Sequence, residues 1–195
     1  MGKVEFKPGN MLYPLPAALV TVRDKEGEDN LFTVAWTGTV CTNPPMLYIS
    51  VRPERYSYKA ITETGVFAVN LTTAPMTKAV DYCGVRSGRN EDKFAAAGLT
   101  KREAVKIGTA VIEESPVNIE CKVRQVLPLG SHHMFIADVV HVTVDEAYMD
   151  EKGTFRLEKA DPIVYSHGTY FDLGQARGSF GFSVRKKKGK KRKKK

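Results

Sequence analysis

Apolar and polar residues alternate along several short stretches of the chain, which is the pattern of half-buried β-strands. The stretch Leu31–Val40 alternates large apolar residues with small or hydroxyl residues, so that Phe32, Val34 and Trp36 share one face. Met46–Val51 resumes the pattern after two successive prolines, which interrupt regular structure, and is expected to pair with the strand before it. The other strands expected in the first half are Ala17–Val22 and Val66–Leu71.

Short helices are expected between the strands. Tyr56–Thr64 has Ser57 near its start and Gly65 just past its end, which are start and stop signals of a helix. Thr77–Cys83 has a weaker helical pattern. Asn90 is expected to cap a further short helix that runs through 94–97 and ends at the following glycine.

The second half of the chain is more strongly β. Val117–Leu127 and Met134–Val144 flank a Pro-Leu-Gly-Ser turn and predict a long hairpin, and Pro162–Tyr170 predicts a last extended segment. Five or six strands with a few short helices indicate a mainly β fold, a small barrel rather than a doubly wound sheet. One domain is expected over residues 1–184.

The charge of the chain is concentrated in its last eleven residues. The net charge is +8, but Arg185–Lys195 holds ten of the thirty Lys and Arg residues and no acid, which leaves residues 1–184 at −2. The sequence pI of about 9.3 therefore belongs to the tail, which is expected to be disordered. A nearly neutral domain gives no basis for nucleic-acid binding beyond non-specific contacts of the tail.

The cysteines indicate a reducing, cytoplasmic setting. Cys41, Cys83 and Cys121 are odd in number and form no CxxC pair, which argues against a disulfide framework. They lack the spacing of a zinc site, so no metal is expected. No stretch approaches the roughly 18 apolar residues of a membrane span, and no membrane partner is expected.

Four stretches carry residues suited to binding chemistry. Thr37–Pro45 offers hydroxyls and approachable backbone amides, but the same residues are also typical of an ordinary Thr-rich edge strand with good β propensity. Arg52–Lys59 places two arginines, a serine and a lysine around a helix start, which suits a phosphate but also describes a solvated basic turn. Cys83–Phe94 is glycine-rich and basic without a P-loop spacing. The adjacent His132 and His133 point to opposite faces if they lie on a strand, which leaves open which one faces a site.

Taken together, these stretches resemble the flavin reductase-like FMN-binding proteins, in particular the flavoredoxin and archaeal ferric reductase types. Six motifs occur in the family's order over most of residues 8–184. They are Thr33–Trp36 through Asn43-Pro44-Pro45, Arg55–Lys59, Phe67–Leu71, Ser87–Phe94, Gly130–His133 and Gly178–Phe182.

The resemblance implies an FMN-binding split β-barrel that forms a homodimer and binds FMN non-covalently near the subunit interface. The flavin carries the hydride or electron chemistry, so no protein nucleophile and no catalytic residue is expected, apart from tuning of the flavin by Lys93 and His132. NAD(P)H is a candidate electron donor, and a redox partner protein a candidate acceptor.

Site residues follow from the resemblance by position. Trp36 is expected beside the isoalloxazine ring, and a segment of five residues along the ring and ribityl chain. Three basic residues and a serine of Arg52–Lys59 are expected to contact the phosphate. The loop at Ser87 and Gly88 is expected to close over the cofactor, and three polar residues are expected to lie near the ring edge. In chain order the expected set is Asn30, Trp36, Thr37, Gly38, Thr39, Val40, Cys41, Arg52, Arg55, Ser57, Lys59, Ser87, Gly88, Lys93 and His132.

Three functions remain open at this point. The first is an FMN-dependent oxidoreductase, with electrons leaving to free flavin, a ferric complex or a protein. The second is a non-enzymatic FMN-binding electron-transfer module. The third is a polyanion binder that acts through the Lys-rich tail, against which stands the simpler interpretation of the tail as a solubilising end.

Overall fold

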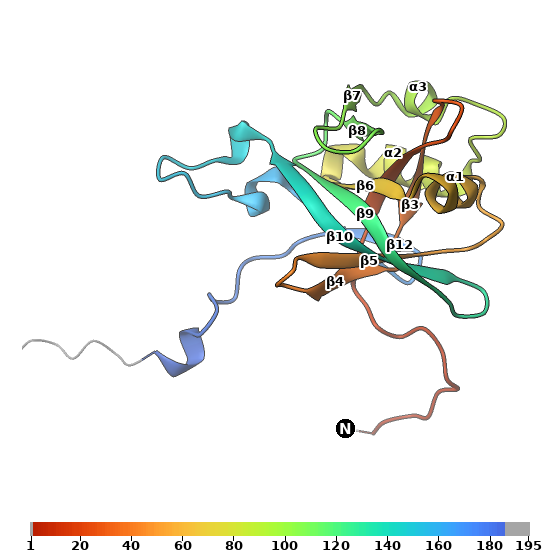
Figure 1. Cartoon of the computed structure of the whole chain (residues 1–195). Coiled ribbons are helices and arrows are strands. Elements are labelled where there is room, and N and C mark those ends of the chain that lie inside the picture. Colours follow the sequence, from red (N-terminus) through yellow and green to blue (C-terminus); the bar gives the residue numbers. More distant parts are fainter. Residues whose placement is uncertain (1, 186–195) are drawn as a thin grey trace, which may run out of the picture.

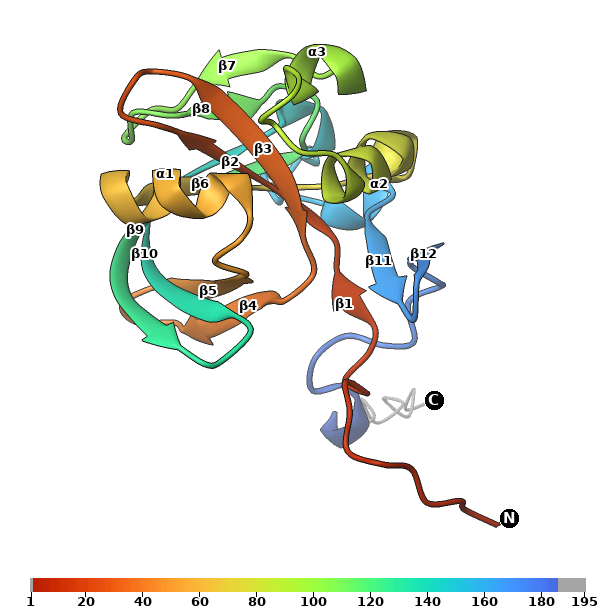
Figure 2. The same ribbon diagram turned by 90° about the vertical axis from the view of Figure 1, so that its right-hand side faces the viewer.

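The computed structural model describes residues 2–185 as a curled β-sheet with short helices on its faces. The tail predicted over Arg185–Lys195 lies outside the described residues from position 186 onward. The main sheet has seven strands in the order β3-β2-β6-β9-β10-β5-β4. Figure 1 shows this sheet curling so that its two edges approach each other, and Figure 2 shows α1 between the two halves.

The main strands are close to those that the alternation predicts. They are β2 (Ala18–Arg23), β3 (Asp29–Val34), β4 (Thr37–Cys41), β5 (Met46–Val51), β6 (Val66–Leu71), β9 (Val117–Pro128) and β10 (His133–Val144). Two small sheets accompany them. One contains β1 (Leu15–Pro16), β11 (Ile163–Ser166) and β12 (Thr169–Asp172), and the other contains β7 (Lys101–Glu103) and β8 (Ala110–Ile112).

The helices are α1 (Tyr56–Thr64), α2 (Thr77–Val85) and α3 (Lys93–Ala97). Short 3₁₀ turns, written η1 to η4, cover Ala74–Met76, Glu146–Tyr148, Leu157–Ala160 and Phe182–Val184. Gly65 ends α1 in the left-handed conformation, as the sequence predicts. The predicted Asn90 cap is wrong, because Asp92 holds that place and its side chain accepts from the amides of Phe94 and Ala95.

Two further expectations need correction. The number of strands is larger than five or six, because β1, β7 and β8 are too short to show an alternation and the predicted segment Pro162–Tyr170 falls on two strands, β11 and β12. Leu31–Val40 is not one strand: the chain bends at Ala35 and Trp36, and the two halves become β3 and β4. These two strands form opposite edges of the main sheet, because β3 pairs with β2 whereas β4 pairs with β5.

The core of the barrel lies inside the curled sheet. Val20, Phe67 and Phe135 from three strands are fully buried there, and Ile61 of α1 reaches into the same cluster. A second cluster packs α2 and α3 against the outer face, with Leu19, Leu31 and Phe94 buried in it. Burial on both faces holds β2 and β3 rigidly, so the bend after β3 has a fixed position.

Candidate functional site

The bend between β3 and β4 opens onto a cavity of about 320 Å³, here called cavity 1. Its walls come from the end of β3, the bend itself, the end of β5, α2 and the β11–β12 turn. The lining residues include Thr33, Trp36, Ser50, Arg52, Arg55, Asp81, Gly84, His132, Tyr165 and Tyr170. Four of the predicted site residues therefore meet in this cavity: Trp36, Arg52, Arg55 and His132.

Part of the cavity 1 lining is cationic. Arg52 and Arg55 are exposed there, and in residues 2–185 neither forms an ion pair with an acid. The Arg55 guanidinium donates a hydrogen bond of 3.1 Å to the carbonyl oxygen of Gly84 at the end of α2, which links two walls of the cavity. Arg55 is also the N-cap of α1 and makes no side-chain capping bond, so the first amides of α1 are open to an anion.

Another part of the cavity 1 lining is aromatic. The rings of Trp36 and His132 lie nearly parallel, with centroids 6.1 Å apart and planes inclined by 12°. Burial, and then the nearby Arg52 charge, lowers the pKa of His132 below its usual range, so the imidazole is neutral at pH 7.

The structure decides between the two adjacent histidines. His132 lines cavity 1, whereas the Nδ1 atom of His133 lies 2.7 Å from the hydroxyl oxygen of Tyr58 on α1. The ring of Tyr58 also meets His133 edge-on. His133 therefore fixes the hairpin tip to α1, and His132 is the histidine that faces the candidate site.

A second cavity of about 510 Å³, here called cavity 2, lies on the other side of the α1 N-terminus. Four predicted site residues line it: Asn30, Ser57, Lys59 and Gly88. Its remaining walls are rich in acids, namely Asp24, Glu26, Glu28, Asp29, Glu63, Glu91 and Asp92. Because Arg55 lines cavity 1 and Tyr56 lines cavity 2, the two cavities meet at the start of α1.

Asn30 and Ser57 form the boundary between the two cavities at the start of α1. Both are buried, and the Asn30 amide donates a hydrogen bond of 2.7 Å to the Ser57 hydroxyl. Gly88 approaches the same amide so closely that a methyl group in its place would overlap the Asn30 side-chain oxygen. A glycine is therefore required where the loop after α2 passes over β3.

Lys93 is a buried lysine behind this loop. Lys93 is only 3% exposed. Its ammonium donates hydrogen bonds of 3.2 Å to the carbonyl oxygens of Cys83 and Arg86. Burial lowers the pKa of Lys93 below its usual range, and the Arg55 charge adds to this effect. Lys93 thus fastens the end of α2 to α3, while Ser87, in the same loop, is exposed.

The predicted hydroxyl-rich segment lies on β4, outside both cavities. The Thr37 hydroxyl is buried and donates to the carbonyl oxygen of Tyr48 at 2.6 Å, so it is used within the sheet. Gly38 packs against the Tyr48 ring, Thr39 and Val40 are exposed, and Cys41 is half-buried. Contacts of this segment with a flavin stay a prediction.

Sequence reasoning missed the part of the cavity 1 lining that comes from β11 and β12. Tyr165 and Tyr170 pack with ring centroids 5.5 Å apart, and the Tyr170 hydroxyl donates to Asp81 at 3.4 Å. Burial, and then Asp81, raises the pKa of Tyr170 to about 12, so the hydroxyl keeps its proton. Two tyrosines five residues apart in the predicted segment Pro162–Tyr170 were the available signal, but nothing local connects them with Trp36.

The cysteines and the acids form no further centre. Burial raises the pKa of the Cys83 thiol to about 11 and that of Cys121 to about 12, so neither is a thiolate near neutral pH. Within residues 2–185 no group of three or more potential ligands is placed to hold a metal ion. The same part of the chain has no helix long and apolar enough to cross a membrane.

Comparison with known proteins defines the class. Residues 10–174 match the family model described as "Flavin reductase like domain". The chain is 31% identical over 141 residues to an uncharacterized protein of Archaeoglobus fulgidus, which covers 72% of this chain and 78% of that protein. The chain therefore belongs to the flavin reductase-like family, and the predicted family is confirmed.

Two solved structures are similar over nearly the whole chain. Flavoredoxin of Desulfovibrio vulgaris (Miyazaki F) has a TM-score of 0.87 and 29% identity, and covers 94% of this chain and 100% of its own. Flavoredoxin of Methanosarcina acetivorans has a TM-score of 0.86 and 28% identity, and covers 95% and 100%. The predicted mainly β split barrel is confirmed, and membership makes this a flavin-related redox protein.

Proposed function

We propose that this protein binds FMN, with the flavin ring in cavity 1 and the phosphate at the start of α1. The observation that carries the proposal is the composition of cavity 1. Two arginines without acidic partners in residues 2–185 and open helix amides line it together with the flat surfaces of Trp36 and His132. A dianionic phosphate joined to a planar heterocycle needs the same combination of groups.

The residues of the chain would bind and orient the cofactor. Arg52 and Arg55 offset the phosphate charge, which would otherwise be costly to desolvate. Ser57 and Asn30 supply a hydroxyl and an amide at the boundary that the phosphate or ribityl chain reaches. Trp36 and neutral His132 give an apolar, uncharged face for the ring.

Bound FMN would supply hydride and electron transfer, which no side chain of the protein performs. The protein would tune it through charge. The buried ammonium of Lys93 favours added negative charge nearby and so favours the reduced cofactor. The fuller prediction is an oxidoreductase that takes electrons from NAD(P)H or a protein donor and passes them to a flavin, a ferric complex or a partner protein.

The alternative is a non-enzymatic electron-transfer module, and the likeness to two flavoredoxins favours this candidate. Anaerobic addition of NADH or NADPH separates the two. Bleaching of the bound flavin at catalytic rates supports the enzyme. Absence of bleaching with both nicotinamides, together with reduction by a protein donor, supports the module.

The cofactor itself is tested by the spectrum of the purified protein. Flavin absorption, followed by heat release and mass spectrometry, identifies FMN. A colourless protein that binds no added FMN would overturn the proposal. The homodimer and a cytoplasmic location stay predictions, the first from the family resemblance and the second from the cysteine pattern.

A further inference from the structure

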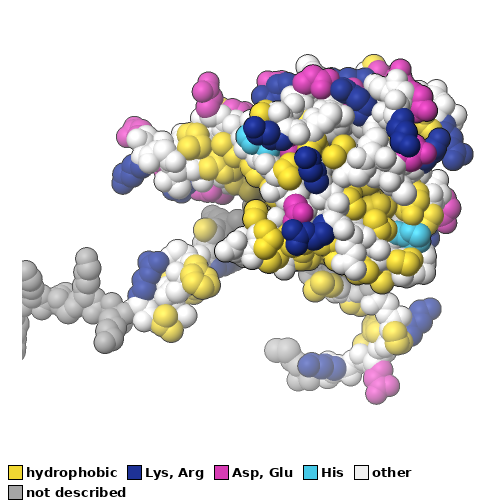
Figure 3. Space-filling view, in the orientation of Figure 1, with side chains coloured by type: hydrophobic (Ala, Val, Ile, Leu, Met, Phe, Trp, Pro, Cys, Tyr) yellow, Lys and Arg dark blue, Asp and Glu magenta, His cyan; other side chains and the backbone are white. Residues whose placement is uncertain are grey.

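Asp81 on α2 is the one acid among the described residues that line cavity 1. It is exposed and forms no ion pair with a base in residues 2–185. Figure 3 shows a different arrangement over the upper part of the molecule, where acidic and basic side chains are mixed and offset one another. The Asp81 charge is not offset in this way, so it acts on whatever the cavity holds.

A tyrosine on the neighbouring strand holds the Asp81 side chain. The Tyr170 hydroxyl donates a hydrogen bond of 3.4 Å to the Asp81 carboxylate. Tyr170 is itself held, because it lies directly opposite Tyr165 in the β11–β12 pair and the two rings pack together. The Tyr165 ring packs in turn on Tyr13, with the ring centroids 6.4 Å apart. This row of rings fixes the Tyr170 hydroxyl, and through it the carboxylate, in the cavity lining.

Arg55 reaches α2 without pairing with Asp81. Its guanidinium donates to the carbonyl oxygen of Gly84, which lies three residues after Asp81 and therefore on the same face of the helix. The two side chains nevertheless form no ion pair. The Arg55 charge thus stays available to an anion, and the Asp81 charge stays without a counterpart.

The charge balance of cavity 1 with FMN indicates what Asp81 does. A phosphate monoester carries about two negative charges at pH 7, and Arg52 and Arg55 offset them. His132 is neutral, so the Asp81 carboxylate is the one charge left over among the described lining residues. Reduction adds negative charge to the flavin ring, and a carboxylate in the same cavity opposes that change.

We propose that Asp81 lowers the reduction potential of FMN bound in cavity 1, and that Tyr170 is a positioning residue that holds Asp81 for this role. The proposal rests on the proposed binding of FMN. The Asp81 charge opposes that of Lys93, which lies behind the loop after α2 and does not line cavity 1. A lower potential makes the reduced cofactor a stronger electron donor, which suits acceptors of low potential.

Anaerobic redox titration of the FMN-loaded protein against a reference dye tests the role of Asp81. Asp81→Asn keeps the size of the side chain and an acceptor for Tyr170 but removes the charge. It should tighten the binding of reduced FMN relative to oxidised FMN about tenfold, which for a two-electron couple raises the potential by about 30 mV. The matched control is Asp172→Asn, the same exchange at an exposed acid of β12 that lines neither cavity, and it should change this ratio less than about twofold.

Tyr170→Phe tests the positioning of Asp81. The variant loses the hydroxyl but keeps the ring that packs on Tyr165. The carboxylate is then free to turn toward solvent, so the ratio of the two FMN affinities should change in the same direction as in Asp81→Asn, by about threefold. In the Asp81→Asn background the same exchange should add nothing. A further rise in the double variant would overturn the positioning role.

The amount of bound FMN, measured from the absorption spectrum, separates this proposal from the proposed function. A wild type that binds no FMN overturns both. Equal FMN content and equal potential in the wild type and Asp81→Asn overturn the role of Asp81 alone, as does an equal shift in Asp172→Asn. A change confined to the KM for NADH or NADPH, with the potential unaltered, would also overturn it, because Asp81 would then contact the electron donor.

Discussion

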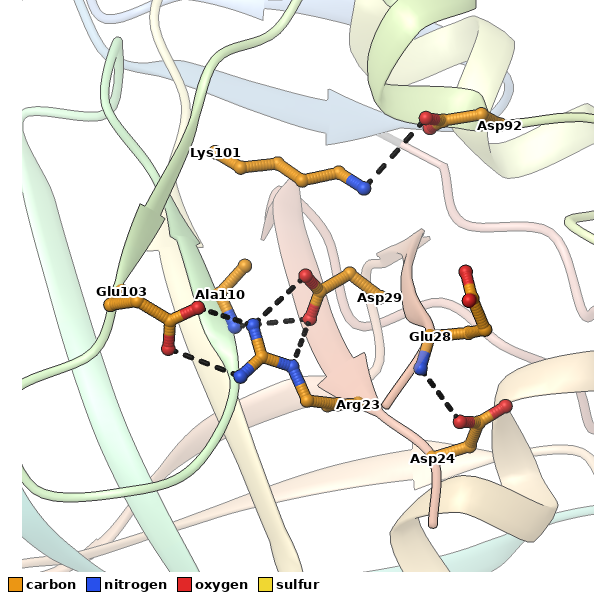
Figure 4. A network of polar contacts seen from close by, with 8 residues as sticks. All are labelled: Arg23, Asp24, Glu28, Asp29, Asp92, Lys101, Glu103 and Ala110. Carbon is orange, nitrogen blue, oxygen red and sulfur yellow. Dashed lines mark hydrogen bonds and ion pairs between the residues drawn. The ribbon is translucent and has the colours of Figure 1, made fainter. Parts of the chain in front are cut away.

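The two cavities that meet at the start of α1 differ in charge and in whether their charged side chains have partners. Cavity 2 is lined by seven acids, most of which already have partners. Figure 4 shows Arg23 between Asp29 and Glu103, with the Arg23–Asp29 contact at 2.9 Å, and Lys101 beside Asp92 at 3.7 Å. Cavity 1 has two arginines that lack acidic partners in residues 2–185.

This difference indicates which cavity is suited to bind an anion. In cavity 2 the carboxylates also accept from backbone amides, as Asp24 does from Glu28 at 2.8 Å, so they hold the β2–β3 turn together. They also repel a second anion. The arginines of cavity 1 form no ion pair within residues 2–185, so an anionic ligand explains their charge better than folding does.

The largest expected effect tests the arginines directly. Replacing Arg52 and Arg55 with alanine removes two charge-assisted contacts to phosphate and should weaken FMN binding about 100-fold or more. Riboflavin, which has the ring but no phosphate, should bind nearly as well as before. Fluorescence titration of both ligands against the flavin-free protein measures the two affinities.

Lys59→Ala is the matched control for this pair. Lys59 lies on the cavity 2 side, 75% of its side chain is exposed, and its ammonium is 3.8 Å from Glu63. Its loss should change FMN affinity less than about fivefold. Equal losses for Lys59→Ala and the arginine pair, or equal losses of FMN and riboflavin, would contradict the placement of the phosphate.

The next effect concerns the wall between the cavities. Gly88→Ala forces a methyl group onto the Asn30 amide oxygen and strains the Asn30–Ser57 hydrogen bond, which should cost about 1–3 kcal/mol of unfolding free energy. Urea denaturation measures this. Gly108→Ala, where a methyl group meets open space, should leave the urea midpoint unchanged. Similar midpoints for both variants would show that the loop at Gly88 moves aside without a measurable loss of stability.

The site was only partly predictable from the sequence, and the bend at Ala35 and Trp36 shows why. Alternation continues through Leu31–Val40, so the local signal indicates one strand. The chain divides there because β3 pairs with β2 and β4 with β5 at opposite edges of the sheet, which is decided by long-range pairing. By contrast, α1 carries its own start and stop signals, and its bounds agree with the prediction.

A smaller effect concerns the aromatic lining of cavity 1. Trp36→Ala removes one aromatic surface and should weaken FMN and riboflavin equally, by about tenfold. The same titrations as for the arginines measure it. The arginine pair is expected to discriminate between the two ligands and Trp36 is not. A loss of FMN affinity without a loss of riboflavin affinity in Trp36→Ala would therefore contradict the placement of the flavin ring against Trp36.

The smallest effect is a change in the pH dependence of stability at Lys93, which lies behind the wall between the cavities. Burial lowers the pKa of Lys93 in the folded protein, whereas the unfolded chain keeps the ordinary value near 10.5. As the pH rises between these two values, the folded state releases its proton first and the unfolded state binds more protons. The wild type should therefore gain stability with pH in that window, by at most about 1.4 kcal/mol per pH unit.

Lys93→Met lacks this proton, so the difference in unfolding free energy between the wild type and the variant should grow in favour of the wild type as the pH rises toward 10.5. Urea denaturation at several alkaline pH values measures the difference. Parallel curves for the wild type and Lys93→Met would mean that the ammonium is solvated in the folded protein and cannot act as a buried charge beside the flavin.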